Sequence, residues 1–257
     1  MMRIAVKIAY QGKGFCGSQM QPGVRTVEDT VLNDLAKIMD RERKWFGLKM
    51  AGRTDRGVNA VGNVAVFNTD LDPKRTVNAL NNISNDIFYR QYAVVGEDFE
   101  PRHASVREYR YILPTDGHDI AKVKECAELF VGERDLKRFC KNDERSTVLT
   151  IRSVSVSARD GLIMIDLRAS HFLWNMIRRI AAAVSSVGTG KHSIGDVRRA
   201  LDGENVSFGL ARPDALFFIG ADYEGIEFAD AVIPEKRIGE DVFRMAMEQE
   251  FFAYMKQ

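Results

Sequence analysis

The chain has 257 residues, of which 45% are hydrophobic and 28% are charged, with a formal net charge of +1. This length and apolar fraction predict one large or two modest globular domains with their own cores. The near-neutral charge excludes a general attraction to nucleic acid, so any phosphate binding must come from a local face of lysines and arginines. Three widely spaced cysteines exclude a disulfide framework and a zinc site, and they indicate a reducing, cytoplasmic compartment.

No segment of the sequence has the pattern of a targeting or membrane element. The first ten residues alternate apolar and polar side chains and lack the apolar core of a secretion signal. No later segment approaches the roughly 20 apolar residues that a membrane span needs. The sequence therefore predicts a soluble protein without membrane partners.

The first half of the chain alternates between strand and helix patterns. Thr26 resembles a helix N-cap, because Glu28 and Asp29 follow it in an acidic first turn and the later apolar residues share one helical face. The predicted elements are a strand at 3–10, a Gly-rich loop to residue 23, a helix after Thr26, strands at 44–51 and 61–68, a helix from Pro73 to Asn81, and a strand at 86–95. Their order is β-α-β-β-α-β.

The second half repeats this order. The predicted elements are a strand at 106–113, a helix at 120–130, two strands within 148–168, helices at 172–187 and 193–201, a strand at 215–223, and an amphipathic helical tail at 240–255. Two copies predict an α+β fold of two tandem ferredoxin-like (β-α-β-β-α-β) domains with antiparallel sheets flanking a central active-site cleft. We place the domains at residues 1–103 and 104–257, the second one including the tail.

The loop Ala51–Val58 is the sharpest local feature. Gly52 and Gly57 bracket Arg53 and Asp55, so the backbone can turn tightly and present the carboxylate at the end of a strand. A connecting turn with a surface salt bridge would have the same local pattern. The loop alone does not decide between these interpretations.

Five blocks, which follow one another along nearly the whole chain, resemble the sequence motifs of a known protein family. They are Tyr10-Gln11-Gly12 with Gly17-Ser18-Gln19 and Thr26-Val27-Glu28, Gly52-Arg53-Thr54-Asp55 with Val64–Phe67, Asp98–Arg102 with Arg107–Tyr111, His171–Arg178, and Ala215–Tyr223. Together they resemble the TruA-type tRNA pseudouridine synthase family. The resemblance implies an isomerase that converts uridine to pseudouridine in tRNA, needs no cofactor or metal, and works as a cytoplasmic homodimer.

The resemblance also assigns roles to residues. It makes Asp55 the catalytic aspartate with Arg53 as its loop partner, and Arg178 the arginine that pairs with the aspartate. Tyr109 matches the tyrosine that stacks on the target base and suits the proton step at C5, and Leu216 matches the apolar residue that packs on the uracil. A neighbouring guanidinium favours and orients an ionised carboxylate. Whether Asp55 adds to C1′, adds to C6 or removes the 2′ proton stays open.

Scattered basic residues are the candidate phosphate contacts, with solvated surface charge as the alternative. Arg102, Arg107 and Arg110 are the predicted substrate-binding arginines, and Lys191, Arg198 and Arg199 are further candidates. The target base must leave its stack to reach the carboxylate, and Arg56 could act as the wedge. The family's bacterial-type members act at positions 38 to 40 of the anticodon stem-loop, which we take as the expected target.

Four positions depart from the family's pattern. Ser18 replaces a tryptophan, Arg56 an alanine, Asn59 a histidine and Asn63 a glutamine. These changes leave the expected chemistry in place and bear on how the substrate is positioned.

Two other classes of protein are alternatives to this family. One is a non-catalytic RNA-binding protein, which the joint presence of Asp55, Tyr109 and Arg178 disfavours. The other is an Asp-nucleophile hydrolase, which would want a metal or a phosphate-cradling loop.

Overall fold

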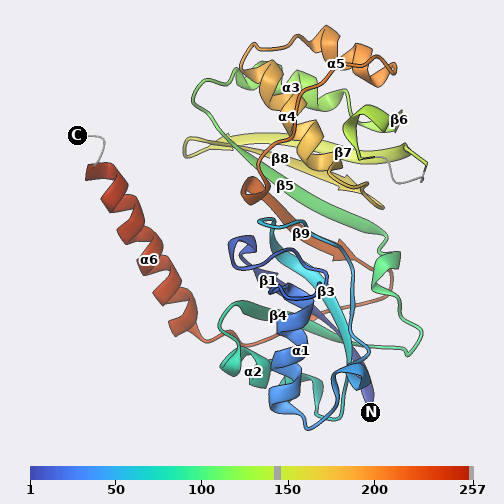
Figure 1. The fold of residues 1–257 in the computed structure, drawn as a ribbon, viewed down its shortest axis with the longest axis vertical. Helices are drawn as coiled ribbons and strands as arrows, with labels where there is room; N and C mark the ends of the chain where they lie inside the picture. The colour runs from blue at the N-terminus through green and yellow to red at the C-terminus, as the bar shows by residue number, and fades with distance from the viewer. Residues whose placement is uncertain (142–145, 255–257) are drawn as a thin grey trace.

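A single mixed sheet runs through the whole protein, for which a computed structural model describes residues 1–141 and 146–254 (Figure 1). The ten-stranded sheet has the order β10-β4-β1-β3-β9-β5-β8-β7-β6, and β2 pairs with β3 off this path. The strands are β1 (Met2–Tyr10), β2 (Lys49–Met50), β3 (Asn59–Thr69), β4 (Ile87–Val95), β5 (Val106–Pro114), β6 (Gly132–Asp135), β7 (Val148–Arg159), β8 (Leu162–Ala169), β9 (Leu216–Asp222) and β10 (Ala229–Asp230).

The two helices of the N-terminal half begin where the sequence predicted them, after Thr26 and at Pro73. Thr26 accepts a hydrogen bond from the backbone N–H of Asp29 at 3.3 Å and precedes α1 (Val27–Ile38). Asp72 accepts from the N–H of Arg75 at 3.0 Å and precedes α2 (Pro73–Ile83), which has proline in its first turn. Both predicted helices are therefore confirmed, because local side chains satisfy their first N–H groups.

The strand predicted at 44–51 is wrong over most of its length. Arg43–Phe46 form a 3-10 helix, and only Lys49–Met50 pair with β3 as β2. Gly47 ends the 3-10 helix in the left-handed region, with a φ of 52°, so an extended run cannot pass through it.

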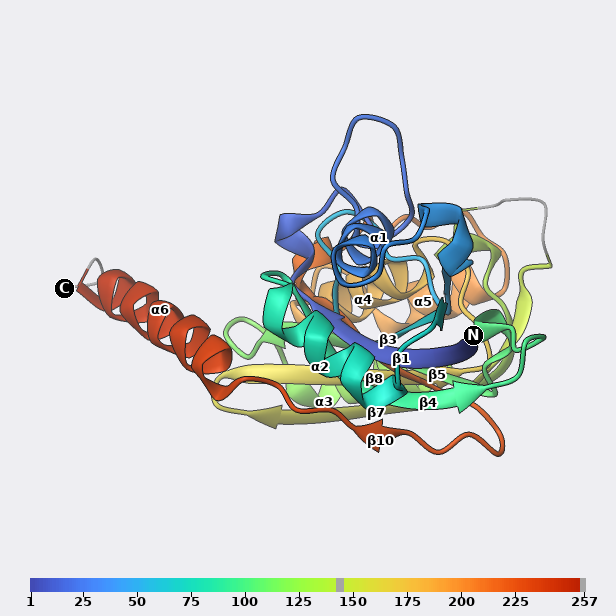
Figure 2. The same cartoon turned by 90° about the horizontal axis from the view of Figure 1, so that it is seen from below.

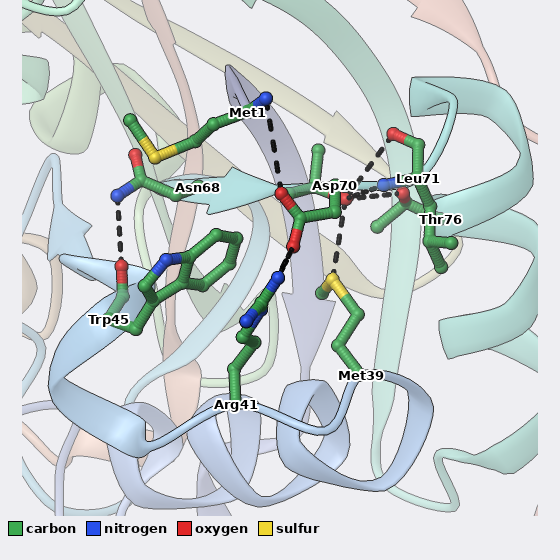
Figure 3. A network of polar contacts seen from close by, with 9 residues as sticks. Met1, Met39, Arg41, Trp45, Asn68, Asp70, Leu71 and Thr76 are labelled. Carbon is green, nitrogen blue, oxygen red and sulfur yellow. Dashed lines mark hydrogen bonds and ion pairs between the residues drawn. The ribbon is translucent and has the colours of Figure 1, made fainter.

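Side-chain contacts fasten the segment after α1 to the end of β3 (Figure 3). Asp70 accepts from Nε and Nη2 of Arg41 at 2.9 and 2.8 Å. Asn68 donates to the carbonyl of Trp45 at 2.9 Å. This network secures the end of β3 that lies away from the loop containing Asp55.

The C-terminal half contains α3 (Ile120–Glu128), α4 (Met176–Gly188) and α5 (Ile194–Leu201), with α3 packed against α4 and β7. The helix predicted at 172–187 begins only at Met176, because Asn175 has a φ of 62° and interrupts the helical backbone before it. Strand β6 was not predicted, since its sequence Gly-Glu-Arg-Asp lacks apolar alternation and lies at the sheet edge.

One sheet replaces the two separate antiparallel sheets that the sequence predicted. Strand β9 pairs antiparallel with β5 and parallel with β3, where Asn59 lies opposite Phe217 and Ala60 opposite Phe218. Gly62 allows this parallel contact between the halves, because a Cβ there would lie 2.2 Å from the carbonyl oxygen of Ile219. Strands β3 and β9 are far apart in the chain, so no periodic pattern in the sequence could predict that they pair.

The last helix, α6 (Glu235–Tyr254), extends away from the body of the molecule (Figures 1 and 2). It begins before the predicted residue 240. Arg237 near its start donates to the carbonyl of Asn81 at 2.9 Å, while Val242, Phe243 and Met245 are 59%, 66% and 53% exposed. Within residues 1–141 and 146–254, no helix combines the length and apolar character needed to cross a membrane.

Candidate active site

A cleft of about 980 Å³ lies beside the seam that joins the two halves. Loops 16–24 and 50–58 of the N-terminal half form one wall. The start of β5, residues 171–178 and the start of β9 form the other. Residues named from the sequence that line the cleft are Arg53, Asp55, Arg56, Arg102, Arg107, Tyr109, Arg178 and Leu216. Arg110, Lys191, Arg198 and Arg199 are absent from the described lining.

Asp55 and Arg178 meet across the cleft, although 123 positions separate them in the chain. Arg178 Nη1 lies 3.3 Å from Asp55 Oδ2 and 3.3 Å from Asn175 Oδ1, and its Nε donates to the carbonyl of Ala211 at 2.8 Å. The Arg178 side chain is 14% exposed and that of Asp55 is 37% exposed. The arginine is therefore anchored within the protein, while the carboxylate remains open to the cleft.

Buried polar side chains hold the loop that contains Asp55. Ser18 exchanges two hydrogen bonds with Thr54: its Oγ accepts from the Thr54 N–H at 2.8 Å, and its N–H donates to the Thr54 carbonyl at 3.0 Å. The Thr54 hydroxyl is 2.9 Å from the Tyr10 hydroxyl. Ser18, Thr54 and Tyr10 are nearly inaccessible to solvent, so the backbone immediately before Asp55 is fixed from two sides.

Asn63 closes this network from β3. Its Nδ2 donates to the Gly52 carbonyl at 3.0 Å and to the Tyr10 hydroxyl at 3.2 Å, and its Oδ1 accepts from the Gly52 N–H at 3.3 Å. Asn63 has no exposed surface. A fully buried amide that satisfies both backbone groups of Gly52 sets the start of the loop.

Asn59 ties the loop's far end to the C-terminal half. Its Oδ1 accepts from the Gly12 N–H at 2.9 Å, and its Nδ2 donates to the Asp214 carbonyl at 2.8 Å. Gly57, with a φ of 86°, makes the turn next to Pro213. Three of the four departures from the family's pattern, at Ser18, Asn59 and Asn63, thus fall on residues that position the loop.

Aromatic and apolar side chains make the opposite wall. The Tyr109 ring stacks on Phe218 with centroids 4.6 Å apart and meets Phe172 edge-on at 5.1 Å. Leu216, at the start of β9, is 5% exposed beside them. Burial raises the pKa of Tyr109 well above its usual range, so its phenol stays protonated at neutral pH. This wall can cover the face of a planar ring and exclude water.

The predicted basic residues divide into two groups. Arg102 is exposed at the cleft, as are Arg53 and Arg56. Arg107 is 8% exposed, and its guanidinium donates to the carbonyls of Arg102 (2.6 Å), Ala51 (3.3 Å) and Ser170. Arg107 therefore links three segments around the cleft, and its guanidinium donates its hydrogen bonds within the protein.

The remaining basic candidates lie outside the cleft. Arg110 forms a two-pronged ion pair with Asp166 on the neighbouring strand, at 2.6 and 3.0 Å. Arg199 pairs with Asp196 at 2.6 Å and with Glu204 at 3.4 Å. These carboxylates already neutralise the two guanidinium groups.

Sequence reasoning passed over Trp174 and Asn175, which also line the cleft. Trp174 is 46% exposed, and the left-handed backbone of Asn175 directs the chain from this rim into α4. Both residues lie inside the block His171–Arg178, in which only Arg178 was assigned a role. The available signal was the tryptophan itself, one of two in the chain, inside a block that resembles a family motif.

The fold and the cleft define an α+β protein whose ion-paired carboxylate, surrounded by arginines, faces an aromatic wall. A family profile described as tRNA pseudouridine synthase matches residues 126–224. The tRNA pseudouridine synthase A of Thermococcus sibiricus is 42% identical over 241 residues, which cover 91% of this chain and 90% of that protein. The enzyme of the same name from Pyrococcus abyssi is 38% identical over 233 residues, covering 88% and 87%. The chain therefore belongs to the tRNA pseudouridine synthase family, which places it among the isomerases.

A solved structure also aligns with the chain. The crystal structure of a Cbf5-Nop10-Gar1 complex matches 71% of this chain and 45% of that chain, at 17% identity and a TM-score of 0.34. A TM-score of this size does not establish a common fold.

Proposed function

We propose that the protein isomerises uridine to pseudouridine in tRNA and that Asp55 is its catalytic carboxylate. The observation that carries this proposal is the contact between Asp55 and Arg178 in a cleft whose opposite wall contains Tyr109 and Leu216. Family membership supports the reaction and the substrate class. The geometry supports the choice of Asp55, because it is the carboxylate among the described residues that line the cleft.

The reaction breaks the glycosidic bond between N1 and C1′, turns the uracil, and joins C5 to C1′; C5 then loses its proton and N1 gains one, so the product is an isomer of the substrate. Asp55 supplies the ionised carboxylate that starts this sequence, by adding to C1′ or C6 or by removing the 2′ proton. Arg178 holds the carboxylate's orientation, because hydrogen bonds to the Ala211 carbonyl and to Asn175 Oδ1 fix its own guanidinium. On each of these routes the Asp55 carboxylate must already be in position when the base binds. The buried contacts of its loop hold it there.

Tyr109 and Leu216 keep the detached uracil in place. Phe218 stacks on the Tyr109 ring and Phe172 meets it edge-on, so the ring is held firmly in the cleft wall that the base would contact. A tyrosine phenol is protonated at neutral pH even at its ordinary pKa, so Tyr109 can serve as a hydrogen-bond donor or proton carrier at C5. Arg53, Arg56 and Arg102 are exposed at the cleft and are placed to meet phosphates or to fill the space left by an unstacked base.

The proposal includes the anticodon stem-loop as target, two ferredoxin-like units at 1–103 and 104–257, and a cytoplasmic homodimer. The strand order β4-β1-β3-β2 in the first half and β9-β5-β8-β7 in the second supports the two units, since the same order recurs. The exposed apolar residues of α6 support a contact surface for a second copy.

A comparison of Asp55→Asn with the wild type tests the function. Unmodified tRNA transcript is incubated with each protein, and pseudouridine is mapped by carbodiimide-dependent primer extension. We expect wild-type product and a loss of at least roughly 1,000-fold in Asp55→Asn, because the amide cannot act as nucleophile or base. Asp160→Asn, at an exposed turn with a φ of 53°, is the matched control and should retain wild-type activity. Equal product from wild type and Asp55→Asn would overturn the assignment, and the position of the stops identifies the target uridine.

A further inference from the structure

A second pocket, of about 180 Å³, lies in the C-terminal half outside the cleft. It is formed by the 3-10 helix Lys137–Phe139, Cys140, Arg179 of α4 and the segment 205–209. Pockets for small organic ligands usually have about 300–1,000 Å³, so this one suits a single small group rather than a nucleoside.

The charged side chains that the structure describes in this pocket are all positive. Lys137, Arg138 and Arg179 line it, and no aspartate or glutamate occurs among its described lining residues. Arg138 donates to the carbonyl of Gly203 at 2.9 and 2.8 Å and to Asn205 Oδ1 at 3.3 Å. These neutral partners fix its guanidinium without cancelling its charge.

Arg179 is the unexplained residue in the pocket. Its Nε is buried and has no hydrogen-bond partner among the described residues. Buried polar groups in folded proteins are nearly always hydrogen-bonded. A guanidinium with an unpartnered Nε among the described residues, beside two other cations, suits an anion from outside the chain.

The pocket is joined to the cleft by a short stretch of chain. Lys141, next to Cys140 of the pocket, donates its N–H to the carbonyl of Trp174 at 2.8 Å, and its Nζ lies 3.8 Å from the centroid of the Trp174 ring. Trp174 lines the cleft and is 46% exposed. An exposed aromatic ring beside a lysine is the combination that proteins use to stack a base and meet its phosphate.

The same helix connects the two sites. Arg178 faces Asp55 in the cleft, and the next residue, Arg179, lines the pocket. Ala211, two residues beyond the pocket segment, exchanges two hydrogen bonds with Arg178, at 2.8 and 3.2 Å. An RNA strand that leaves the cleft past Trp174 and Lys141 would therefore reach Arg179 next.

We infer that this pocket binds a backbone phosphate of the RNA substrate outside the target-uridine cleft, with Arg179 as its central contact. The inference rests on the proposed function for the identity of the polyanion. It differs from the sequence-based expectation, which placed phosphate contacts at Arg102, Arg107, Arg110, Lys191, Arg198 and Arg199. Arg107 and Arg110 direct their donors to carbonyls and to Asp166, whereas Arg179 Nε has no partner among the described residues.

The test measures tRNA affinity at several salt concentrations for wild type, Arg179→Gln, Arg179→Lys and the control Arg159→Gln, which lies at the exposed end of β7. Losing one phosphate contact should lower the affinity by about tenfold and reduce the slope of log K against log salt by about one. Arg179→Lys should keep most of that slope because it keeps the charge. The rate of a single turnover at saturating tRNA should be unchanged in the control Arg159→Gln.

A salt slope for Arg179→Gln equal to that of the wild type and of Arg159→Gln would overturn the inference. Thermal unfolding of each variant establishes that it is folded, and Arg179→Lys gives a second measurement if Arg179→Gln is not. If the wild type neither binds nor modifies tRNA, the proposed function fails instead, so the two failures are distinguishable.

A second arm separates an RNA phosphate from free phosphate. Inorganic phosphate is titrated at constant ionic strength while thermal unfolding is followed. We expect no stabilisation that depends on Arg179. Stabilisation of the wild type that Arg179→Gln abolishes, with unchanged salt dependence of tRNA binding, would assign the pocket to free phosphate and overturn the RNA assignment.

Discussion

The two walls of the cleft position their groups by different means. On the N-terminal wall, hydrogen bonds from Ser18, Tyr10 and Asn63 hold the loop that presents Asp55. On the C-terminal wall, packing between rings places Tyr109 against Phe218 and Phe172. A charged group in an irregular loop needs directional contacts, whereas a ring on a strand needs only shape and burial. The first wall should therefore be sensitive to lost hydrogen bonds, and the second to changed volume.

The largest effect on stability is expected at Asn63, on the hydrogen-bonded wall. Asn63→Leu removes the partners of the Gly52 N–H and carbonyl and should lower the free energy of unfolding by roughly 3 kcal/mol, because each buried group left unpaired costs about 1–3 kcal/mol. It should also lower kcat by roughly 100-fold with little change in KM, because the loosened loop would no longer hold the Asp55 carboxylate in position.

Urea denaturation and steady-state kinetics below the unfolding temperature measure these two effects. Asn82→Leu, at an exposed position of α2, is the matched control and should change stability by no more than about 0.5 kcal/mol. If Asn63→Leu had wild-type stability and kcat, the expectation that the N-terminal wall depends on its hydrogen bonds would be wrong.

A smaller effect is expected on the packed wall at Tyr109. Tyr109→Phe keeps the ring and should change stability by less than about 1 kcal/mol near neutral pH. Burial raises the pKa of Tyr109 in the folded protein, so its contribution is fully present below the unfolded pKa of about 10 and is lost as pH rises beyond it. At about pH 11 the wild type should have lost roughly 1.4 kcal/mol more than Tyr109→Phe.

Urea denaturation of both proteins at about pH 8 and about pH 11 checks this sign. Catalysis at neutral pH gives the complementary result: Tyr109→Phe should lose activity if the phenol serves the proton step. An equal loss of stability in both proteins on raising the pH would show that Tyr109 ionises as freely in the folded state as in the unfolded one.

The smallest effect is expected at Arg110, which belongs to neither wall. Arg110→Gln breaks the ion pair with Asp166 and should cost about 1 kcal/mol of stability, as partly exposed pairs do. Its tRNA affinity and salt slope should stay at wild-type values, whereas Arg102→Gln, exposed at the cleft, should weaken binding. A reduced slope of log K against log salt in Arg110→Gln would show that this arginine does contact the RNA.

Local signals in the sequence determined most of the elements, and the resemblance to the family selected the candidate residues. Thr26 and Asp72 are caps whose partners lie within three residues, so α1 and α2 could be predicted from the sequence. The motif residues Asp55, Tyr109, Arg178 and Leu216 were chosen from the sequence, and the structure brings them to one cleft.

Only the tertiary structure decided how the halves meet and which arginines remain free. The parallel pairing of β3 with β9 and the contact from Asp55 to Arg178 join residues far apart in the chain, where no periodic pattern records them. Arg107 and Arg179 look alike as residue types, yet one is surrounded by carbonyls and the other has an unpartnered Nε. The availability of a guanidinium for RNA depends on the acceptors around it in space, which the folded chain alone supplies.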